Sequence, residues 1–343
     1  KSMKDKTESI KQALLTVLAL AVMVVIFGVF LMTQGVNPIQ IYGDMIVSTL
    51  GNSYGIGQVV VKSSPFIMVA VATAISAKAG LVNVGGEGQL AIGALLATFV
   101  AVFVAKSMPG PVGILLMLVA GALGGAVWSG LAGLMKVKAG MNETLTTVIM
   151  NYIAYDIVSF FVYGILKDPE SFSWPMSPEI ADKLRLPEIY VGVSIGIFGA
   201  VAVAIVTWLV LKKSACGFRL RVIGGNAEAA KHAGFSVAKI QMAAMLISGA
   251  ISGIAGMVEI AGVEGRLRTT TGVNYGYYGF LAAWMAWNNP LAAIITSVVI
   301  GFLCVAGNVL EQSSGLPSSG TKILMALVLL GILWKGKGRK KCS

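Results

Sequence analysis

Long apolar runs recur along almost the whole chain and restrict it to one class of fold. The first run covers residues 13–32. The later runs lie at residues 58–77, 80–105, 112–135, 144–166, 190–211, 241–262, 273–287, 290–310 and 321–334. A helix that crosses a bilayer needs roughly 20 apolar residues, so the runs predict about ten transmembrane helices. The 273–287 run is too short for an upright span, and we expect a broken or re-entrant element there.

The composition excludes a water-soluble protein. Of the 343 residues, 56% are hydrophobic and only 12% are charged, whereas a soluble domain has about 25% charged residues. Such a chain cannot cover a surface that faces water, which excludes a soluble enzyme, a nucleic-acid-binding domain and a disordered scaffold. We predict an all-α polytopic integral membrane protein that forms a single membrane domain over residues 1–343.

The lysines and arginines indicate how the chain is oriented. If the N-terminus is cytoplasmic and there are ten crossings, 18 of the 26 lysines and arginines lie in the cytoplasm. The other eight lie outside: Lys62, Lys106, Lys167, Lys183, Arg185, Arg266, Arg268 and Lys322. This excess follows the positive-inside rule and accounts for the net charge of +11 without a nucleic-acid partner. We therefore predict a multi-pass protein of the cell membrane with both termini in the cytoplasm.

The same orientation divides the chain into parts. Residues 1–11 form a cytoplasmic N-terminus, residues 12–334 the membrane domain, and residues 335–343 a basic cytoplasmic tail. Two long polar loops interrupt the membrane domain. The loop at 167–189 has mixed charge and lies outside, and the loop at 212–240 is basic and lies in the cytoplasm.

The sequence lacks several motifs of catalytic and metal-binding sites. His232 is the only histidine, and Cys216, Cys304 and Cys342 lie far apart. One histidine excludes zinc sites of the HExxH or Cys₂His₂ kind and any triad built around a second histidine, and we expect three free thiols. Neither GxxxxGKS nor GxxxxGKT, the phosphate-binding loop, occurs in the chain. We predict a protein that is not an enzyme, has no catalytic or metal-binding residues and binds no cofactor of its own.

A glycine-rich segment with a carboxylate separates two of the apolar runs. Residues 79–90 read AGLVNVGGEGQL, with Glu87 between the amides Asn83 and Gln89. Glycine lets a helix break or lets two backbones approach closely. A carboxylate inside a membrane costs several kcal/mol unless it is paired or hydrated, which makes Glu87 a candidate functional group. The alternative is a structural hydrogen-bond hub, or a position at the cytoplasmic edge.

A polar stripe crosses the apolar run at 144–166. Thr144, Thr147, Asn151 and Tyr155 are spaced 3, 4 and 4 residues apart, which places them on one face of a helix. Because lipid offers no hydrogen bonds, this face must point at protein or at a water-filled path. The stripe is either part of a transport route or a set of contacts between helices.

A second glycine-interrupted segment lies in the other half of the chain. Residues 271–280 read TGVNYGYYGF and lead to Trp284. Two such short segments, one in each half, are typical of a transporter's midplane site, and the aromatic residues suit stacking on a planar ligand. An aromatic belt at the membrane interface explains the tyrosines equally well. We predict a transport route lined by residues of all three patterns: Asn83, Glu87, Gln89, Asn151, Tyr155, Asn274 and Tyr275.

The basic loop contains a short helix with clear ends. Asn226 is a good N-cap, Glu228 falls in the first turn, Lys231 and His232 fall in the last, and Gly234 lies at the stop. The pattern predicts a helix of about two turns on the cytoplasmic side. Such a helix either docks a partner or lies at the membrane interface.

At these four places the sequence resembles the permease subunit of an ATP-binding cassette (ABC) importer. The branch it resembles includes ribose, simple-sugar, branched-chain amino acid and purine-nucleoside permeases. GLVNVGGEGQLAIGA (residues 80–94) is similar to that family's early motif, and residues 217–259 are similar to its cytoplasmic loop and following helix. NETLTTVIMNYIA (142–154) is most similar to the nucleoside permeases. The resemblance covers roughly residues 10–335, but WNNP at 287–290 stands where the family usually has a Gly-Gly pair.

The resemblance implies a permease fold of about ten helices and a set of partners. These are a second permease subunit, identical or different, two cytoplasmic ATPase subunits and an extracytoplasmic substrate-binding lipoprotein. ATP would be hydrolysed by the separate ATPase subunits, and the solute would be a nucleoside or a simple sugar. The cytoplasmic helix would couple to the ATPase through Gly225, Asn226, Glu228, Ala229, Ala230 and Gly234.

An ion-coupled secondary transporter is the alternative from another class. It would use H⁺ or Na⁺ and the carboxylates of Glu87, Asp156 or Glu259. Such a transporter needs no docking helix for an ATPase, so the capped helix in the basic loop favours the ABC importer.

Overall fold

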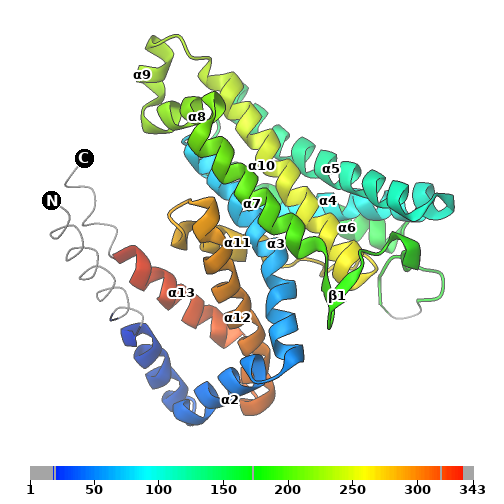
Figure 1. Ribbon diagram of the computed structural model, residues 1–343, viewed down its shortest axis with the longest axis vertical. Coiled ribbons are helices and arrows are strands. Elements are labelled where there is room, and N and C mark those ends of the chain that lie inside the picture. Colours follow the sequence, from blue (N-terminus) through cyan, green and yellow to red (C-terminus); the bar gives the residue numbers. More distant parts are fainter. Residues whose placement is uncertain (1–17, 19–20, 172–173, 317–318, 335–343) are drawn as a thin grey trace. The chain divides into compact units, whose positions relative to one another are not determined.

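Helices make up most of the computed structural model in Figure 1, which describes residues 18, 21–171, 174–316 and 319–334. A helix at Ala21–Thr33 precedes the labelled ones. The α-helices are α2 (Pro38–Leu50), α3 (Ser53–Lys78), α4 (Gly86–Phe99), α5 (Gly110–Ala139), α6 (Glu143–Tyr163), α7 (Gly196–Lys213), α8 (Ala215–Gly225), α9 (Ala227–His232), α10 (Val237–Glu259), α11 (Tyr275–Met285), α12 (Pro290–Ser314) and α13 (Ser319–Trp334). Shorter elements are the π-helices η1 (Val100–Val104) and η4 (Ile260–Glu264), the 3-10 helices η2 (Ala105–Ser107) and η3 (Asp182–Leu184), and the strands β1 (Glu188–Tyr190) and β2 (Val193–Ser194).

Seven helical segments of the described chain are long and apolar enough to cross a membrane. They are α3, α4 with η1 and η2, α5, α6, α7, α10 with η4, and α12. The helix Ala21–Thr33 and α2 are bent by 115° at the break between them and add an eighth span if the pair counts as one. The all-α polytopic fold is thus confirmed. The run at 13–32 lies partly outside the described residues, so the count of ten crossings stays a prediction.

The apolar run at 80–105 does not form one continuous helix. Residues 79–85 are not helical, and α4 begins only at Gly86. The break has a local cause, because Gly80 ends α3 with a left-handed φ of +76°, the conformation that glycine provides at helix C-termini. The irregular segment leaves the first turn of α4 open to contacts from other helices.

The runs at 190–211 and 273–287 also contain less helix than their lengths suggest. The first begins with the antiparallel hairpin β1–β2, and α7 starts after it. Its sequence EIYVGVS combines β-branched and aromatic residues with a turn at Gly192, where φ is +72°. The second run contains the 11-residue helix α11, in agreement with the expected short element.

Three helices form the core of the larger of two compact units. The units are Val60–Val298 and the two ends of the chain, Lys1–Val59 with Val299–Ser343. Within the larger unit, α10 lies against α5 and α4 (Figure 1). A Cβ on Gly249 would collide with the Gly125 backbone, and one on Gly256 would lie 2.7 Å from the Ala94 nitrogen. Small residues at such crossings let membrane helices approach closely, and this packing fixes the position of α4.

The smaller unit contains the bend between Ala21–Thr33 and α2. Asn37 caps α2 by accepting a hydrogen bond from the Ile39 N–H (3.0 Å), and Pro38 follows at the first helical position. Both features start a new helix, which explains the break. The Tyr42 hydroxyl donates to the Val24 carbonyl (2.6 Å) and ties the two helices together.

The long mixed-charge loop after α6 folds onto the segment that follows α10. The Ser177 N–H donates to the Leu267 carbonyl (2.8 Å), and the Leu267 N–H donates to the Ser177 hydroxyl (2.9 Å). Glu179 forms ion pairs with Arg185 and with Arg266, the latter at 2.9 Å. The loop is therefore an ordered surface in its described residues.

Candidate transport site

The polar stripe of α6 faces the non-helical segment between α3 and α4. The Thr147 hydroxyl accepts a hydrogen bond from the Val84 N–H (3.3 Å), and the Thr144 hydroxyl donates to the Val82 carbonyl (3.4 Å). Both partners are backbone groups that no helix satisfies, and buried backbone groups need partners. The stripe therefore points at protein along one face of α6, as its spacing predicts.

Asn151 joins the two sides of the helix break. Its side-chain oxygen accepts from the Gly88 N–H (2.8 Å) in the first turn of α4, and its amide donates to the Val84 carbonyl (3.0 Å). The first N–H groups of a helix have no partner within that helix. Asn151, which is only 1% exposed, thus caps α4 from a neighbouring helix.

Glu87 lies in the first turn of α4 and caps a different helix, α11. Its carboxylate accepts hydrogen bonds from the backbone N–H groups of Asn274, of Gly276 (2.6 Å) and of Tyr277 (3.3 Å). The Tyr155 hydroxyl donates a fourth hydrogen bond to it (2.7 Å). The N-termini of α4 and α11 therefore meet at one buried carboxylate, whose negative charge the positive ends of both helix dipoles stabilise.

Two amides form a pair beside this carboxylate group. The Gln89 amide donates to the Asn83 side-chain oxygen (3.1 Å), and the Asn83 amide lies 3.4 Å from the Gln89 oxygen. The Asn83 oxygen also accepts from the Gly85 N–H (2.8 Å), and its amide donates to the Ser248 hydroxyl of α10 (3.0 Å). The pair connects the irregular segment to the central helix α10.

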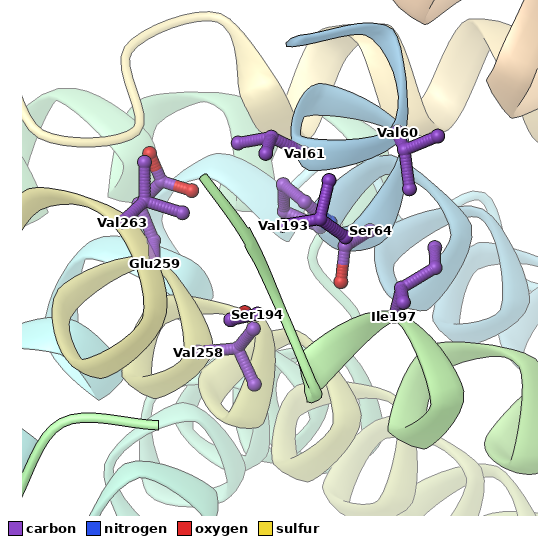
Figure 2. A pocket seen from close by; sticks show the side chains of 10 residues that line it. Val60, Val61, Ser64, Val193, Ser194, Ile197, Val258, Glu259 and Val263 are labelled. Carbon is purple, nitrogen blue, oxygen red and sulfur yellow. The ribbon is translucent and has the colours of Figure 1, made fainter. Parts of the chain in front are cut away.

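The Tyr275 hydroxyl belongs to a second polar group, which it forms with Lys62 and Glu259. It accepts from the Lys62 ammonium and donates to the Glu259 carboxylate (3.1 Å). Figure 2 shows Glu259 beside a cavity lined mainly by valines, with the Ser64 hydroxyl at its wall. This cavity has a volume of only about 10 Å³, too small for an organic solute.

A larger cavity of about 240 Å³ lies between α3, the irregular segment and α11. Its lining residues are Thr73, Ala77, Gly80, Leu81, Val82, Asn83, Phe280, Trp284 and Asn288. The rings of Phe280 and Trp284 are 5.8 Å apart between centroids and inclined by 46°. Asn83 and Asn288 add amides, and the Asn288 side-chain oxygen has no hydrogen-bond partner in the described part of the chain. We call this the amide–aromatic cavity, since it offers aromatic faces and amides to a planar polar solute.

The seven predicted path residues fall into four sets of contacts. Glu87, Tyr155 and Asn274 share the carboxylate cap, Asn83 pairs with Gln89, Asn151 contacts the segment between them, and Tyr275 bonds to Lys62 and Glu259. Five of the seven are buried: Asn83, Glu87, Gln89, Asn151 and Tyr275. Asn83 also lines the amide–aromatic cavity. These contacts favour the hydrogen-bond hub, and the path role of the seven stays a prediction.

The sequence of this membrane bundle matches a known transport family. Residues 55–333 match the family model described as "branched-chain amino acid transport system / permease component". The match extends over most of the chain. The chain belongs to this family.

Relatives of the permease have specific solutes in their names. A glucose ABC transporter permease of Haloferax volcanii is 32% identical over 318 residues, 89% of this chain and 83% of the relative. A guanosine ABC transporter permease of Bacillus subtilis is 29% identical over 321 residues, 88% of each chain. A nucleoside ABC transporter permease of Lactococcus lactis is 25% identical over 350 residues, 97% of this chain and 93% of the relative. The resemblance to ABC importer permeases is thus confirmed.

The ion-coupled alternative is not favoured by these findings. Its three candidate carboxylates have different surroundings in the permease. Asp156 is exposed on α6. The Glu87 carboxylate accepts hydrogen bonds from the first turn of α11, and the Glu259 carboxylate accepts one from the Tyr275 hydroxyl.

The WNNP sequence of the permease keeps the backbone conformation that glycine favours. Trp287 has a φ of +53° and Asn288 a φ of +54°, in the left-handed region where a non-glycine residue is uncommon. The family resemblance places a Gly-Gly pair here. The turn therefore retains a glycine-like shape while Asn288 adds a side chain to the amide–aromatic cavity.

The short helix of the basic loop forms as the sequence predicts. The Asn226 side chain accepts from the Ala229 N–H (3.0 Å) and starts α9. Gly234 ends it with a φ of +84°, and the Phe235 N–H donates to the Ala230 carbonyl (3.0 Å), the bond of a Schellman C-cap. Of the predicted coupling residues, Ala230 is buried within the permease, whereas Gly225, Asn226, Glu228, Ala229 and Gly234 are exposed.

Three residues at the site were not among those predicted from the sequence. Thr73 lines the cavity, Ser248 binds Asn83, and Lys62 joins Tyr275. Thr73 and Ser248 are polar residues within long, mainly apolar helices, and Lys62 is a charge within the run at 58–77. Buried polar groups inside a membrane are rare and need partners, and this was the available signal.

Proposed function

We propose that the permease carries nucleosides across the membrane as part of an ABC importer, with simple sugars as the second candidate. The observation that carries this proposal is the amide–aromatic cavity, because Trp284 and Phe280 suit a planar base and Asn83 and Asn288 suit hydroxyls and base edges. The guanosine and nucleoside permeases among the relatives support a nucleoside as the solute, and the glucose permease supports a simple sugar.

An uptake panel tests the solute. The importer complex is reconstituted in vesicles, and uptake of labelled guanosine, adenosine, ribose, glucose and leucine is compared with and without ATP. We expect saturable, ATP-dependent uptake of the nucleosides. Uptake confined to sugars would select the second candidate, and uptake of leucine alone would contradict both.

Replacement of Trp284 probes the cavity itself. Base stacking on an aromatic side chain contributes about 1–3 kcal/mol, so Trp284→Leu is expected to raise the KM for guanosine about tenfold. Trp284→Phe retains a stacking surface and should restore most of the affinity. Initial uptake rates against guanosine concentration measure both. An unchanged KM in Trp284→Leu, with normal amounts of permease in the membrane, would place the solute elsewhere.

We propose three kinds of partner for the permease, on the basis of its family and of the exposed helix α9. Separate cytoplasmic ATPase subunits would hydrolyse ATP, an extracytoplasmic lipoprotein would deliver the solute, and a second permease subunit, identical or different, would complete the route. A contact inside the chain supports the coupling role of α8 and α9. A Cβ on Gly224 of α8 would collide with the Lys78 carbonyl, and one on Gly80 would lie 3.2 Å from Gly224. A movement of α8 would therefore shift the turn at residues 78–80, which leads to Asn83.

The orientation can be tested with a cysteine on α8. Cys216 is exposed, whereas Cys342 lies outside the described residues. In a chain with Cys304→Ser and Cys342→Ser, we expect Cys216 to resist a membrane-impermeant maleimide in intact cells and to react in inverted vesicles. Labelling of Cys216 in intact cells would contradict the proposed orientation, because it would show that α8 and α9 lie outside the cytoplasm.

A further inference from the structure

A positively charged cavity lies beside α8 and shares one lining residue, Asn288, with the amide–aromatic cavity. It has a volume of about 360 Å³ and is bounded by the ends of α3 and α7, by α8 and by the turn between α11 and α12. Its lining residues are Lys78, Trp208, Leu211, Lys212, Arg221, Asn288, Asn289 and Pro290. Three of these carry a positive charge and none carries a negative one.

The three cations are not neutralised by the described residues. Neither lysine nor Arg221 forms an ion pair there. The Arg221 guanidinium donates to the Leu211 carbonyl, and the Lys212 ammonium lies 4.8 Å from the centroid of the Trp208 ring. Lys78 and Lys212 lie in the last turns of α3 and α7, where each offsets about half a charge of the helix dipole. A net positive charge remains in the cavity and favours an anion.

The surface next to the cavity indicates what kind of anion it binds. On α7, the apolar side chains that precede Lys212 are exposed: Ile205, Val206, Leu209 and Val210. Trp208 belongs to the same stretch of α7 and lines the cavity beside Lys212, and tryptophan is enriched where a bilayer meets water. Basic pockets between membrane helices bind anionic headgroups. We infer that the cavity binds the phosphate of an anionic phospholipid, whose acyl chains lie along α7.

Lipid binding to matched variants tests this inference. The full-length permease is purified in neutral detergent, and binding of phosphatidylglycerol and phosphatidylcholine is titrated by native mass spectrometry. The test variant is Lys212→Gln with Arg221→Gln. The control is Lys213→Gln with Arg219→Gln, which removes the same charge from the same two helices at exposed residues that do not line the cavity.

The expected result is a selective loss in the cavity variant. Each cation near an anionic lipid contributes roughly fivefold to binding, so Lys212→Gln with Arg221→Gln should bind phosphatidylglycerol about twenty-five-fold more weakly. The control should stay within about twofold of the unchanged chain, since neither Lys213 nor Arg219 lines the cavity. Phosphatidylcholine should bind equally to all three. If loss of the Arg221 contact disturbs folding, Lys78→Gln with Lys212→Gln should give the same selective loss.

Three outcomes would overturn the inference. One is equal weakening in the cavity variants and the control, which would assign binding to general charge. A second is equal affinity of the unchanged permease for the two lipids. The third is displacement of phosphatidylglycerol by millimolar inorganic phosphate, which would assign the cavity to a soluble phosphate rather than a lipid.

Discussion

Replacement of Glu87 by leucine is expected to destabilise the permease more than any other single change at the site. Leucine would leave three backbone N–H groups at the start of α11 and the Tyr155 hydroxyl without their acceptor. Each unpaired buried donor costs about 1–3 kcal/mol, and the membrane supplies no water to replace the acceptor. We therefore expect a loss of roughly 4 kcal/mol or more and little permease in the membrane.

Two milder variants separate the charge from the hydrogen bonds. Both Glu87 oxygens accept from donors, so the amide of Glu87→Gln would face N–H or O–H groups in either orientation. Tyr155→Phe removes a single hydrogen bond. The expected order of thermal stability in detergent is Tyr155→Phe, then Glu87→Gln, then Glu87→Leu as the least stable. Normal stability of Glu87→Leu together with abolished uptake would show that the carboxylate serves transport and not the fold.

Asn151→Leu extends the same reasoning to α6. This change removes the cap of Gly88 and the partner of the Val84 carbonyl at similar side-chain volume. We expect a loss of about 2–4 kcal/mol, seen as a lower unfolding temperature in detergent. Reduced uptake by a variant of unchanged stability would instead support the path role of the α6 stripe.

Features encoded by neighbouring residues could be predicted from the sequence. The apolar runs predicted the membrane helices, the spacing of the α6 stripe predicted its common face, and Asn226 with Gly234 predicted the ends of α9. Each of these depends on side chains within a few residues of one another, where helix geometry and capping rules apply directly.

Features that depend on distant parts of the chain could not be predicted in this way. Glu87 finds its backbone partners 187 to 190 residues later, and no local pattern specifies that α11 begins at this carboxylate. The amide–aromatic cavity likewise combines Thr73 with Phe280 and Trp284. The hairpin before α7 was missed because its apolar residues extend the hydropathy of the following helix.

Replacement of Gly234 by valine is expected to have the largest effect on coupling to the ATPase. Gly234 has a φ of +84°, and a Cβ there would contact no other atom within 4 Å. The harm would therefore come from the backbone alone, since a β-branched residue strongly disfavours the left-handed conformation. The end of α9 should unravel or turn in another direction, while the membrane helices stay folded. We expect loss of ATPase co-purification and of uptake.

Gly140 provides the matched control, because it ends α5 with a φ of +65° and a Cβ on it would also have no atom within 4 Å. Gly140→Val introduces the same kind of backbone strain at the end of α5 instead of α9. This variant should still co-purify with the ATPase subunits. Ala229→Asp adds a charge to the exposed face of α9 without backbone strain and should impair docking as Gly234→Val does. Co-purification and solute-stimulated ATP hydrolysis measure all three. If Gly234→Val and Ala229→Asp both assemble and hydrolyse ATP normally, α9 is not the docking helix, because neither its shape nor its surface charge would then matter to the partner.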